Sequence, residues 1–174
     1  SLSYAFSERL SFAITPTASV GQVIVDPFLL AAPDDADGSL QPRFPSGRGA
    51  KYQWGGGVQI SAHYKATPFL NFGASIKSPQ WFNSLEITGT DELGRPRDLS
   101  LDMELPMIIS LGVASTAISN TVVAVDFRYV DYKNTDGFGP SGFNPDGSLA
   151  GLGWSNQFGL NVGIQRCVSD VLTL

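Results

Sequence analysis

The sequence contains few of the residues that usually build disulfide, metal or nucleic-acid sites. One cysteine, Cys167, excludes a disulfide within the chain, and with one histidine, His63, it excludes the common Cys/His zinc sites. Charged residues make up 16% of the 174 residues, well under the roughly 25% of an average soluble domain. The chain has 11 Lys and Arg against 16 Asp and Glu, for a net charge of −5. Without a basic cluster we expect no nucleic-acid partner, because phosphate binding needs grouped Lys and Arg.

Three long stretches carry no charge at all, at residues 10–25, 105–125 and 147–165. The second is long enough for a membrane-spanning helix. However, Pro106 and Gly112 interrupt it, and Ser, Thr and Asn residues fill its middle. The valines that follow favour extended backbone. The sequence therefore predicts strands here rather than a helix.

Apolar and polar residues alternate with a period of two through most of the chain, and no comparable segment shows a helical period. In Val58–Lys65, for example, Val, Ile, Ala and Tyr share one face, and Gln, Ser, His and Lys share the other. The pattern predicts an all-β protein with six full strands and two short terminal ones. The full strands are expected at about 10–20, 54–65, 69–78 (or on to 88), 99–116, 121–132 and 154–165, and the short ones at Leu2–Phe6 and Val171–Leu174.

The connections between these strands alternate between short and long. Short ones lie at 7–9, 66–68, 117–120 and 166–170, and long ones at 21–53, about 89–97 and 133–153. This is typical of an antiparallel up-and-down transmembrane β-barrel, with all long loops at one end. The expected strand ends also carry aromatic residues, as the two membrane interfaces favour. They are Tyr52, Trp54, Trp81, Phe82, Tyr132 and Trp154 beside long loops, and Tyr64 and Phe69 beside a short turn.

A soluble β-sandwich is the alternative to a membrane barrel, because it also alternates. The polar face favours the barrel, since it holds mostly Ser, Asn, Gln and Gly rather than Lys, Glu and Arg. The two short terminal strands fall below the roughly 9–11 residues that span a bilayer. Because a sheet in lipid must close, residues 1–174 are expected to be one barrel domain fragment, internal to a larger barrel.

The polar face offers His63, Asp126 and Arg128 as lumen residues. His63 suggests either a polar network or, less simply, a hydrolase that would also need a serine and an orienting partner. Arg128 could bind a carboxylate head group, or it could pair with Asp126 in a structural ladder of charges. We expect no catalytic residue and no enzyme activity.

The longest loop contains an apolar stretch, Val23–Ala32, interrupted only by Asp26 and Pro27. An exposed apolar loop often marks a binding site, whereas a buried one would be a small core of the loop itself or an extension of the preceding strand. Both interpretations stay open. In the first, the ligand-contacting residues are Phe28, Leu29 and Leu30, together with Trp81 and Phe82.

Neither cofactor nor metal binding is predicted from motifs. Residues 34–38 (DDADG) and 134–137 (NTDG) hint at calcium loops, but they lack the full register and the glutamate at the twelfth position. Loosely held divalent ions at the outer surface are left open. Residues 55–57 (GGG) begin a strand rather than a phosphate-binding loop, and there glycine eases a bend or a close contact.

Three segments together resemble the FadL-type outer-membrane transporters of long-chain fatty acids and aromatic hydrocarbons. Residues 153–165 (GWSNQFGLNVGIQ), followed by 168–174 (VSDVLTL), are similar to a late strand and turn of that family, although Arg166 stands near its usual Tyr. Residues 105–113 resemble its LP…G strand start, and 125–132 (VDFRYVDY) resemble its D-x-x-Y strand. The resemblance covers most of the chain from Gly56 onward. No role is assigned to Arg166 or Cys167.

The resemblance implies a fourteen-stranded barrel plugged by an N-terminal hatch. The hatch would lie before Ser1, and the strands that close the barrel would follow Leu174. It implies passive uptake of hydrophobic small molecules through a bacterial outer membrane, with capture by extracellular loops and exit through a gap in the wall. The expected surroundings are membrane lipid and lipopolysaccharide, and we expect a monomer. The alternative function is a structural or adhesive outer-membrane barrel whose long loops bind surfaces or lipopolysaccharide.

Overall fold

The computed structural model describes residues 1–23, 26–39, 41–48 and 51–167. Over these residues the chain forms thirteen strands joined by turns and loops. None of the described segments is a helix of the length and hydrophobicity needed to cross a membrane. The all-β fold expected from the sequence is confirmed.

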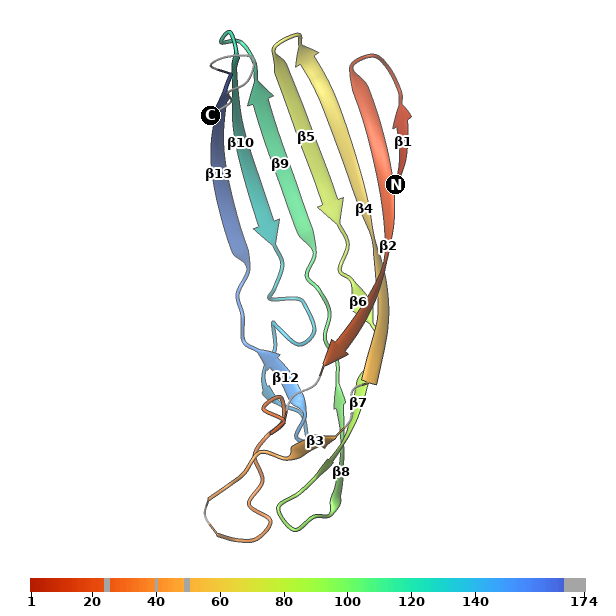
Figure 1. Ribbon diagram of the computed structural model, residues 1–174, viewed down its shortest axis with the longest axis vertical. Helices are drawn as coiled ribbons and strands as arrows, with labels where there is room; N and C mark the ends of the chain where they lie inside the picture. Colours follow the sequence, from red (N-terminus) through yellow and green to blue (C-terminus); the bar gives the residue numbers. More distant parts are fainter. Residues whose placement is uncertain (24–25, 40, 49–50, 168–174) are drawn as a thin grey trace.

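Seven strands of the described chain form one large antiparallel sheet and stand in it in chain order (Figure 1). They are β1 (Leu2–Ala5), β2 (Leu10–Val23), β4 (Lys51–Thr67), β5 (Leu70–Lys77), β9 (Ile108–Ser115), β10 (Thr121–Val130) and β13 (Gln157–Arg166). A two-residue strand, β6 (Trp81–Phe82), also pairs with β4. This order is the up-and-down meander that the alternating connections predict.

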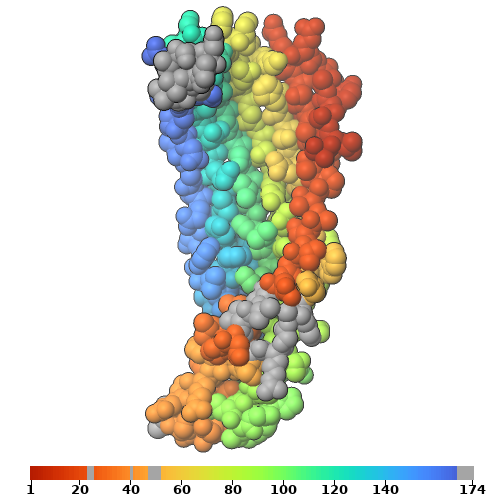
Figure 2. Space-filling view, viewed as in Figure 1, coloured from red at the N-terminus to blue at the C-terminus, as the bar shows by residue number. Residues whose placement is uncertain are grey.

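The long connections fold together at one end of the large sheet. They contain a three-stranded sheet of β3 (Ser46–Arg48), β7 (Leu85–Thr90) and β8 (Pro96–Leu101), and a hairpin of β11 (Ser141–Phe143) and β12 (Leu149–Leu152). Figure 1 shows these elements at the bottom and the short turns at the top. In Figure 2 the loop segments gather into one mass below the sheet. We call this part the loop end.

The strand register gives the large sheet one apolar and one polar face. One cross-strand row contains Phe12, Ala62, Ala74, Leu111, Phe127 and Leu160. The next row contains Ser11, His63, Gly73, Gly112, Asp126 and Asn161. Since successive side chains of a strand point to opposite faces, these rows lie on opposite sides of the sheet. The alternation seen in the sequence is therefore aligned across all the neighbouring strands.

The apolar face of the large sheet lies at the surface of the described chain. Many of its large side chains are exposed, from 38% for Phe127 to 74% for Leu2, and others, such as Val113 and Val125, are half-buried. The buried hydrophobic residues lie instead at the loop end, where Leu30 and Met103 pack against them. This loop core consists of Phe28, Ala31, Leu85, Ile87, Leu99, Leu101 and Leu149. The described residues place no second layer against the apolar face, as a sandwich would require.

The structure corrects one expected strand and several strand ends. The strand expected at 99–116 is two elements, because β8 ends at Leu101 and β9 begins at Ile108. Pro106, which has no N–H to donate to a ladder, lies between them. The expected strand 154–165 begins only at Gln157, since the Trp154 N–H donates to the Phe138 carbonyl at 2.8 Å instead. The short strand at Leu2–Phe6 is present as β1, whereas Val171–Leu174 lies outside the described residues.

Candidate functional site

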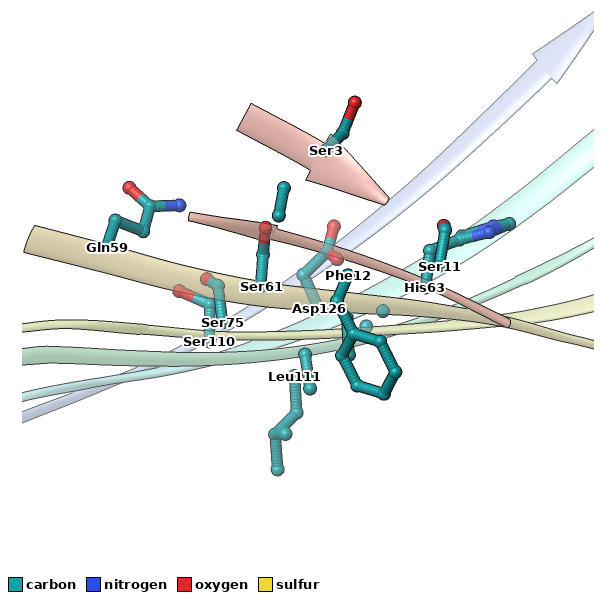
Figure 3. Close-up of a pocket in the computed structure, with 15 residues that line it drawn as sticks. Ser3, Ser11, Phe12, Gln59, Ser61, His63, Ser75, Ser110, Leu111 and Asp126 are labelled. Carbon is teal, nitrogen blue, oxygen red and sulfur yellow. The ribbon is translucent and has the colours of Figure 1, made fainter. Parts of the chain in front are cut away.

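The polar face of the sheet carries a hollow of about 410 Å³. Serines from five strands, the His63 imidazole and the Asp126 carboxylate line it, with Gly73 and Gly112 between them. Figure 3 shows Asp126 and Ser61 on one side of the sheet and the side chains of Phe12 and Leu111 on the other. The lining serines are Ser3, Ser11, Ser61, Ser75 and Ser110.

Two glycines open the floor of this hollow. Cross-strand pairing runs from His63 to Gly73, on to Gly112, and then to Asp126. A Cβ at Gly112 would clash with the Asp126 carboxylate, whereas a Cβ at Gly73 would meet nothing within 4 Å. The carboxylate therefore leans over Gly112, and the space above Gly73 stays open.

His63, Asp126 and Arg128 all lie on the polar face, and the described residues give them no partner. None of the ion pairs formed by the described residues includes Asp126 or Arg128, and none of their hydrogen bonds reaches the His63 ring. Asp126 and Arg128 are therefore not paired with each other in the described structure, and a wider ladder of charges across the lumen stays a prediction. The Ser11 side chain lies across the strand pair from His63, but no hydrogen bond of the described structure joins it to the His63 ring, as a hydrolase would need.

Trp81 and Phe82 form β6, which fits against the glycines of β4. Register pairs Trp81 with Gly56 and Phe82 with Gly55. A Cβ on Gly55 would lie 2.6 Å from the Phe82 ring and would also strike the Trp81 carbonyl. Asn83 then fastens this segment, because its side-chain oxygen accepts the Trp54 N–H at 2.6 Å. The close contact anticipated at residues 55–57 is thus present, and Trp81 is left 60% exposed.

The apolar loop stretch is divided between core and surface. The Phe28 side chain is 1% exposed within the loop core, and its N–H donates to the Pro45 carbonyl at 2.8 Å. Leu30 packs against the same core, whereas Leu29 is 56% exposed. Ile24 and Val25 lie outside the described residues. Phe28 and Leu30 thus both contact the loop core, and the Leu29 side chain points to the surface.

Charged groups at the loop end are held by local hydrogen bonds and by ion pairs between loop segments. Arg97 lies 3.4 Å from the Asp34 carboxylate and donates to the Ala32 carbonyl at 3.0 Å. Hydrogen bonds from Ser148 lower the pKa of Asp146 below its usual value. Burial, with the nearby Asp136 and Asp102 carboxylates, raises the pKa of Glu104.

Sequence reasoning missed most of the residues that organise the loop end. Leu85 and Ile87 alternate with polar residues, as do Leu99 and Leu101. A turn sequence, DELG at 91–94, separates the two pairs. This alternation could have identified the β7–β8 hairpin. No pattern in the sequence indicates that Phe28 packs with Leu149, which lies far along the chain.

The fold is similar to those of solved hydrocarbon channels. CymD, a monoaromatic hydrocarbon channel, matches with a TM-score of 0.63 at 15% identity, over 94% of this chain and 53% of CymD. The Ralstonia pickettii toluene transporter TbuX matches with a TM-score of 0.68 at 15% identity, over 98% and 51% of the two chains. The Pseudomonas putida toluene transporter TodX matches with a TM-score of 0.61 at 16% identity, over 98% and 50%.

The chain shares the fold of these channels. It spans about half of their length. No protein-family model and no curated protein matches the sequence. The resemblance to FadL-type transporters suggested by the sequence motifs is confirmed in the fold.

Proposed function

We propose that this chain is one part of a bacterial outer-membrane β-barrel that takes up hydrophobic small molecules without covalent chemistry. The single observation that carries the proposal is the two-faced sheet, whose apolar side stays uncovered while its other side forms a polar hollow. Soluble proteins bury such apolar faces, whereas a barrel wall exposes them to lipid. The described sheet also ends in two strands, β1 and β13, and their outer edges are paired with no described strand. Because open edges are not tolerated in lipid, we infer that strands outside this chain close the barrel.

The aromatic residues fit a membrane of ordinary thickness. Trp54 and Tyr64 lie on the same face of β4, ten residues apart, and are 66% and 44% exposed. At about 3.3 Å per residue the strand between them is roughly 33 Å long. With a tilt of about 40°, this gives an apolar band of roughly 25 Å, as outer-membrane barrels have. By the same analogy the loop end faces the cell exterior, where it would meet lipopolysaccharide, and one copy of the barrel acts alone.

Capture is proposed to occur at the loop end. Leu29 and Trp81 expose apolar surface near this end, the half-buried Phe82 lies beside Trp81, and Phe28 and Leu30 hold the loop in place from the core. A hydrophobic molecule gains free energy by leaving water for such a surface. A molecule captured at the loop end would not have to diffuse through the charged lipopolysaccharide layer. The hydrocarbon ligands of CymD, TbuX and TodX make monoaromatic hydrocarbons the first class to test, ahead of fatty acids.

The polar face of the large sheet does not by itself favour the structural or adhesive alternative. A solid barrel would fill its bore with ion pairs and side-chain hydrogen bonds. The described polar face instead carries small side chains around an open hollow, and Asp126 and Arg128 are unpaired within it. Such a face leaves room for a ligand or for another segment of the whole protein.

The proposal is tested with the full-length protein in the outer membrane of intact cells that lack their own hydrocarbon channel. We expect labelled toluene to enter several-fold faster than in cells with an empty vector. Leu29→Ser should lower this uptake, since it removes exposed apolar area but no core contact. Leu93→Ser changes a leucine of similar exposure in the β7–β8 turn, 48% against 56% for Leu29, and serves as the matched control. Uptake equal to that of the empty vector contradicts the proposal, and competition by oleate would shift it toward fatty acids.

A further inference from the structure

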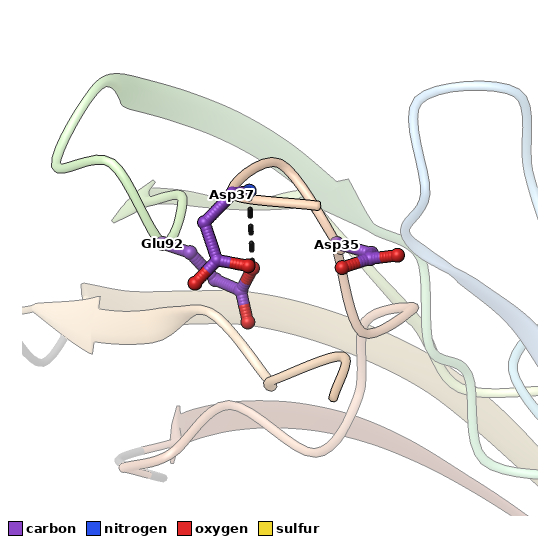
Figure 4. Close-up of side chains that lie close together, drawn as sticks. All are labelled: Asp35, Asp37 and Glu92. Atoms are coloured by element: carbon purple, nitrogen blue, oxygen red, sulfur yellow. Dashed lines mark hydrogen bonds between the residues drawn. The ribbon is translucent and has the colours of Figure 1, made fainter. Parts of the chain in front are cut away.

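Three carboxylates from two separate loop segments meet at the loop end. Asp35 and Asp37 belong to the loop between β2 and β3, and Glu92 belongs to the turn between β7 and β8 (Figure 4). One carboxylate oxygen from each lies within 4.8 Å of the other two. Like charges so close repel one another. A site of this kind is stable when something positive lies among the oxygens.

Glu92 gives an independent sign that a ligand belongs here. Its side chain is only 3% exposed, yet none of the described residues donates a hydrogen bond to Oε1. Oε2 accepts only a long one, from the Asp37 N–H at 3.5 Å. Burying a carboxylate without partners is costly, so buried charges in proteins are paired or coordinate metals. The Glu92 carboxylate is buried among the other two acidic groups and is poorly satisfied by the protein.

Arg43 is the positive group beside Glu92, and it satisfies the carboxylate poorly. Its Nε is 3.9 Å from Oε1, beyond hydrogen-bond distance, and its side chain is 71% exposed. The Arg43 backbone is held by two hydrogen bonds to Asp34, but its guanidinium extends into solvent. The other nearby cation, Arg97, is already paired with Asp34. Arg43 can therefore turn away when a stronger cation arrives.

The geometry points to a Ca²⁺ ion held by Asp35, Asp37 and Glu92, which links the β2–β3 loop to the β7–β8 turn. Ca²⁺ forms bonds of about 2.3–2.6 Å to six to eight oxygens, so oxygens up to about 5 Å apart can share one ion, and water completes the shell. The donors are all carboxylates, without His or Cys, which favours a hard cation over zinc or copper. Hydrogen bonds from Ser39 lower the pKa of Asp37, which keeps this ligand ionised.

The sequence motifs missed this site because its ligands come from two segments. Residues 34–38 lack the glutamate at the twelfth position of a calcium loop, and Glu92 supplies a carboxylate from another hairpin. The site is independent of the proposed uptake function, since a loop-stabilising ion fits a channel and an adhesive barrel equally. Calcium sites of extracellular modules bind with a Kd of about 10⁻⁴–10⁻³ M, and we expect this range.

The test is calorimetric titration of CaCl₂ into the full-length protein, refolded in detergent free of lipopolysaccharide and treated with EDTA. We expect one site, weakened at least about tenfold by Glu92→Gln and by Asp37→Asn, which remove ligand charge. Asp37 is exposed, so its variant retains the fold even if the buried Glu92 change does not. Glu86→Gln, an exposed glutamate on β7, is the matched control and should bind like the wild type. Folding of each variant is checked by its heat-dependent gel mobility.

Arg43→Gln separates the calcium proposal from the simpler interpretation that Arg43 is the counter-ion of Glu92. If Ca²⁺ is the ligand, removing the competing charge should tighten its binding by about threefold or more. If Arg43 is the counter-ion, the variant should lose stability, and Ca²⁺ should not restore it. Such a loss of stability without rescue would overturn the proposal. So would wild-type affinity in both Glu92→Gln and Asp37→Asn, or no binding by the wild type at about 10 mM Ca²⁺.

Discussion

At the scale of single residues, glycine decides how closely two strands approach. Gly55 of β4 lies directly under the backbone of β6, where a Cβ would strike the Trp81 carbonyl. Gly73 of β5 has nothing within 4 Å of the same position. The two glycines occupy one sheet and have ordinary strand backbones, so they differ mainly in the space around them. At position 55 glycine is needed because β6 packs directly against it. At position 73 glycine is not needed for packing, and its missing side chain leaves the hollow open.

Gly55→Ala should destabilise the protein by about 1–3 kcal/mol, because a methyl group there forces the backbone of β6 to move. Gly73→Ala should change stability by less than about 0.5 kcal/mol. Urea unfolding of the two variants in lipid bilayers, followed by tryptophan fluorescence, measures the difference. Equal stability of the two variants would show that β6 can shift without cost.

At the scale of elements, a turn in the β11–β12 connection fixes the loop core from one side. The Asp146 carboxylate accepts the Ser148 N–H at 2.9 Å and the Ser148 hydroxyl at 2.7 Å. The next residue, Leu149, is 8% exposed in the core, and its N–H donates to the Leu30 carbonyl at 3.0 Å. One ionised side chain therefore orders the turn that places Leu149.

The stability of this turn should depend on acid pH. The pKa of Asp146 is lower in the folded protein than its usual 3.8, so its ionised form stabilises the turn above that pH. The contribution is lost as pH falls through the folded pKa. We expect the protection of residues 144–149 against hydrogen exchange, corrected for intrinsic rates, to be constant at neutral pH and to fall as the pH drops below about 5 and through the folded pKa of Asp146. Asp146→Asn should show a smaller change with pH, and an unchanged profile would remove the role given to this carboxylate.

Element by element, the sequence predicts the large sheet well and the loop end poorly. β4, β5, β10 and β13 repeat a period of two for eight residues or more, because each face of a strand meets one kind of environment along its whole length. The strands β3, β7, β8, β11 and β12 are three to six residues long. Their formation depends on partners in other loops, which a local pattern does not contain.

The same reason explains what could be predicted about the candidate site. Alternation alone assigns His63, Asp126 and Arg128 to the polar face. It does not reveal that Gly73 and Gly112 open a hollow between them, since that follows from the register of four strands. The burial of Phe28 and the meeting of Glu92 with Asp37 likewise depend on contacts between distant loops.

At the scale of the whole molecule, the chain reverses the usual distribution of apolar residues. The large sheet exposes Phe, Ile, Leu and Val, and the loop end buries its own small core. A soluble protein with such a surface would aggregate. In the barrel proposed above this surface would face lipid, and the loop core would give the long loops a fold of their own outside the bilayer.

Leu111 and Ser110 of β9 allow a direct test, because they are neighbours in the chain and lie on opposite faces. In a membrane barrel, Leu111→Arg places a charge near the bilayer midplane and should cost about 2–4 kcal/mol in bilayer folding experiments. Ser110→Arg points into the hollow and should cost much less. In a soluble protein the order would reverse, since Leu111 is 51% exposed and exposed positions tolerate arginine. Urea titration of both variants of the full-length protein in vesicles gives the two free energies. Equal tolerance of Leu111→Arg and Ser110→Arg would contradict a lipid-facing wall.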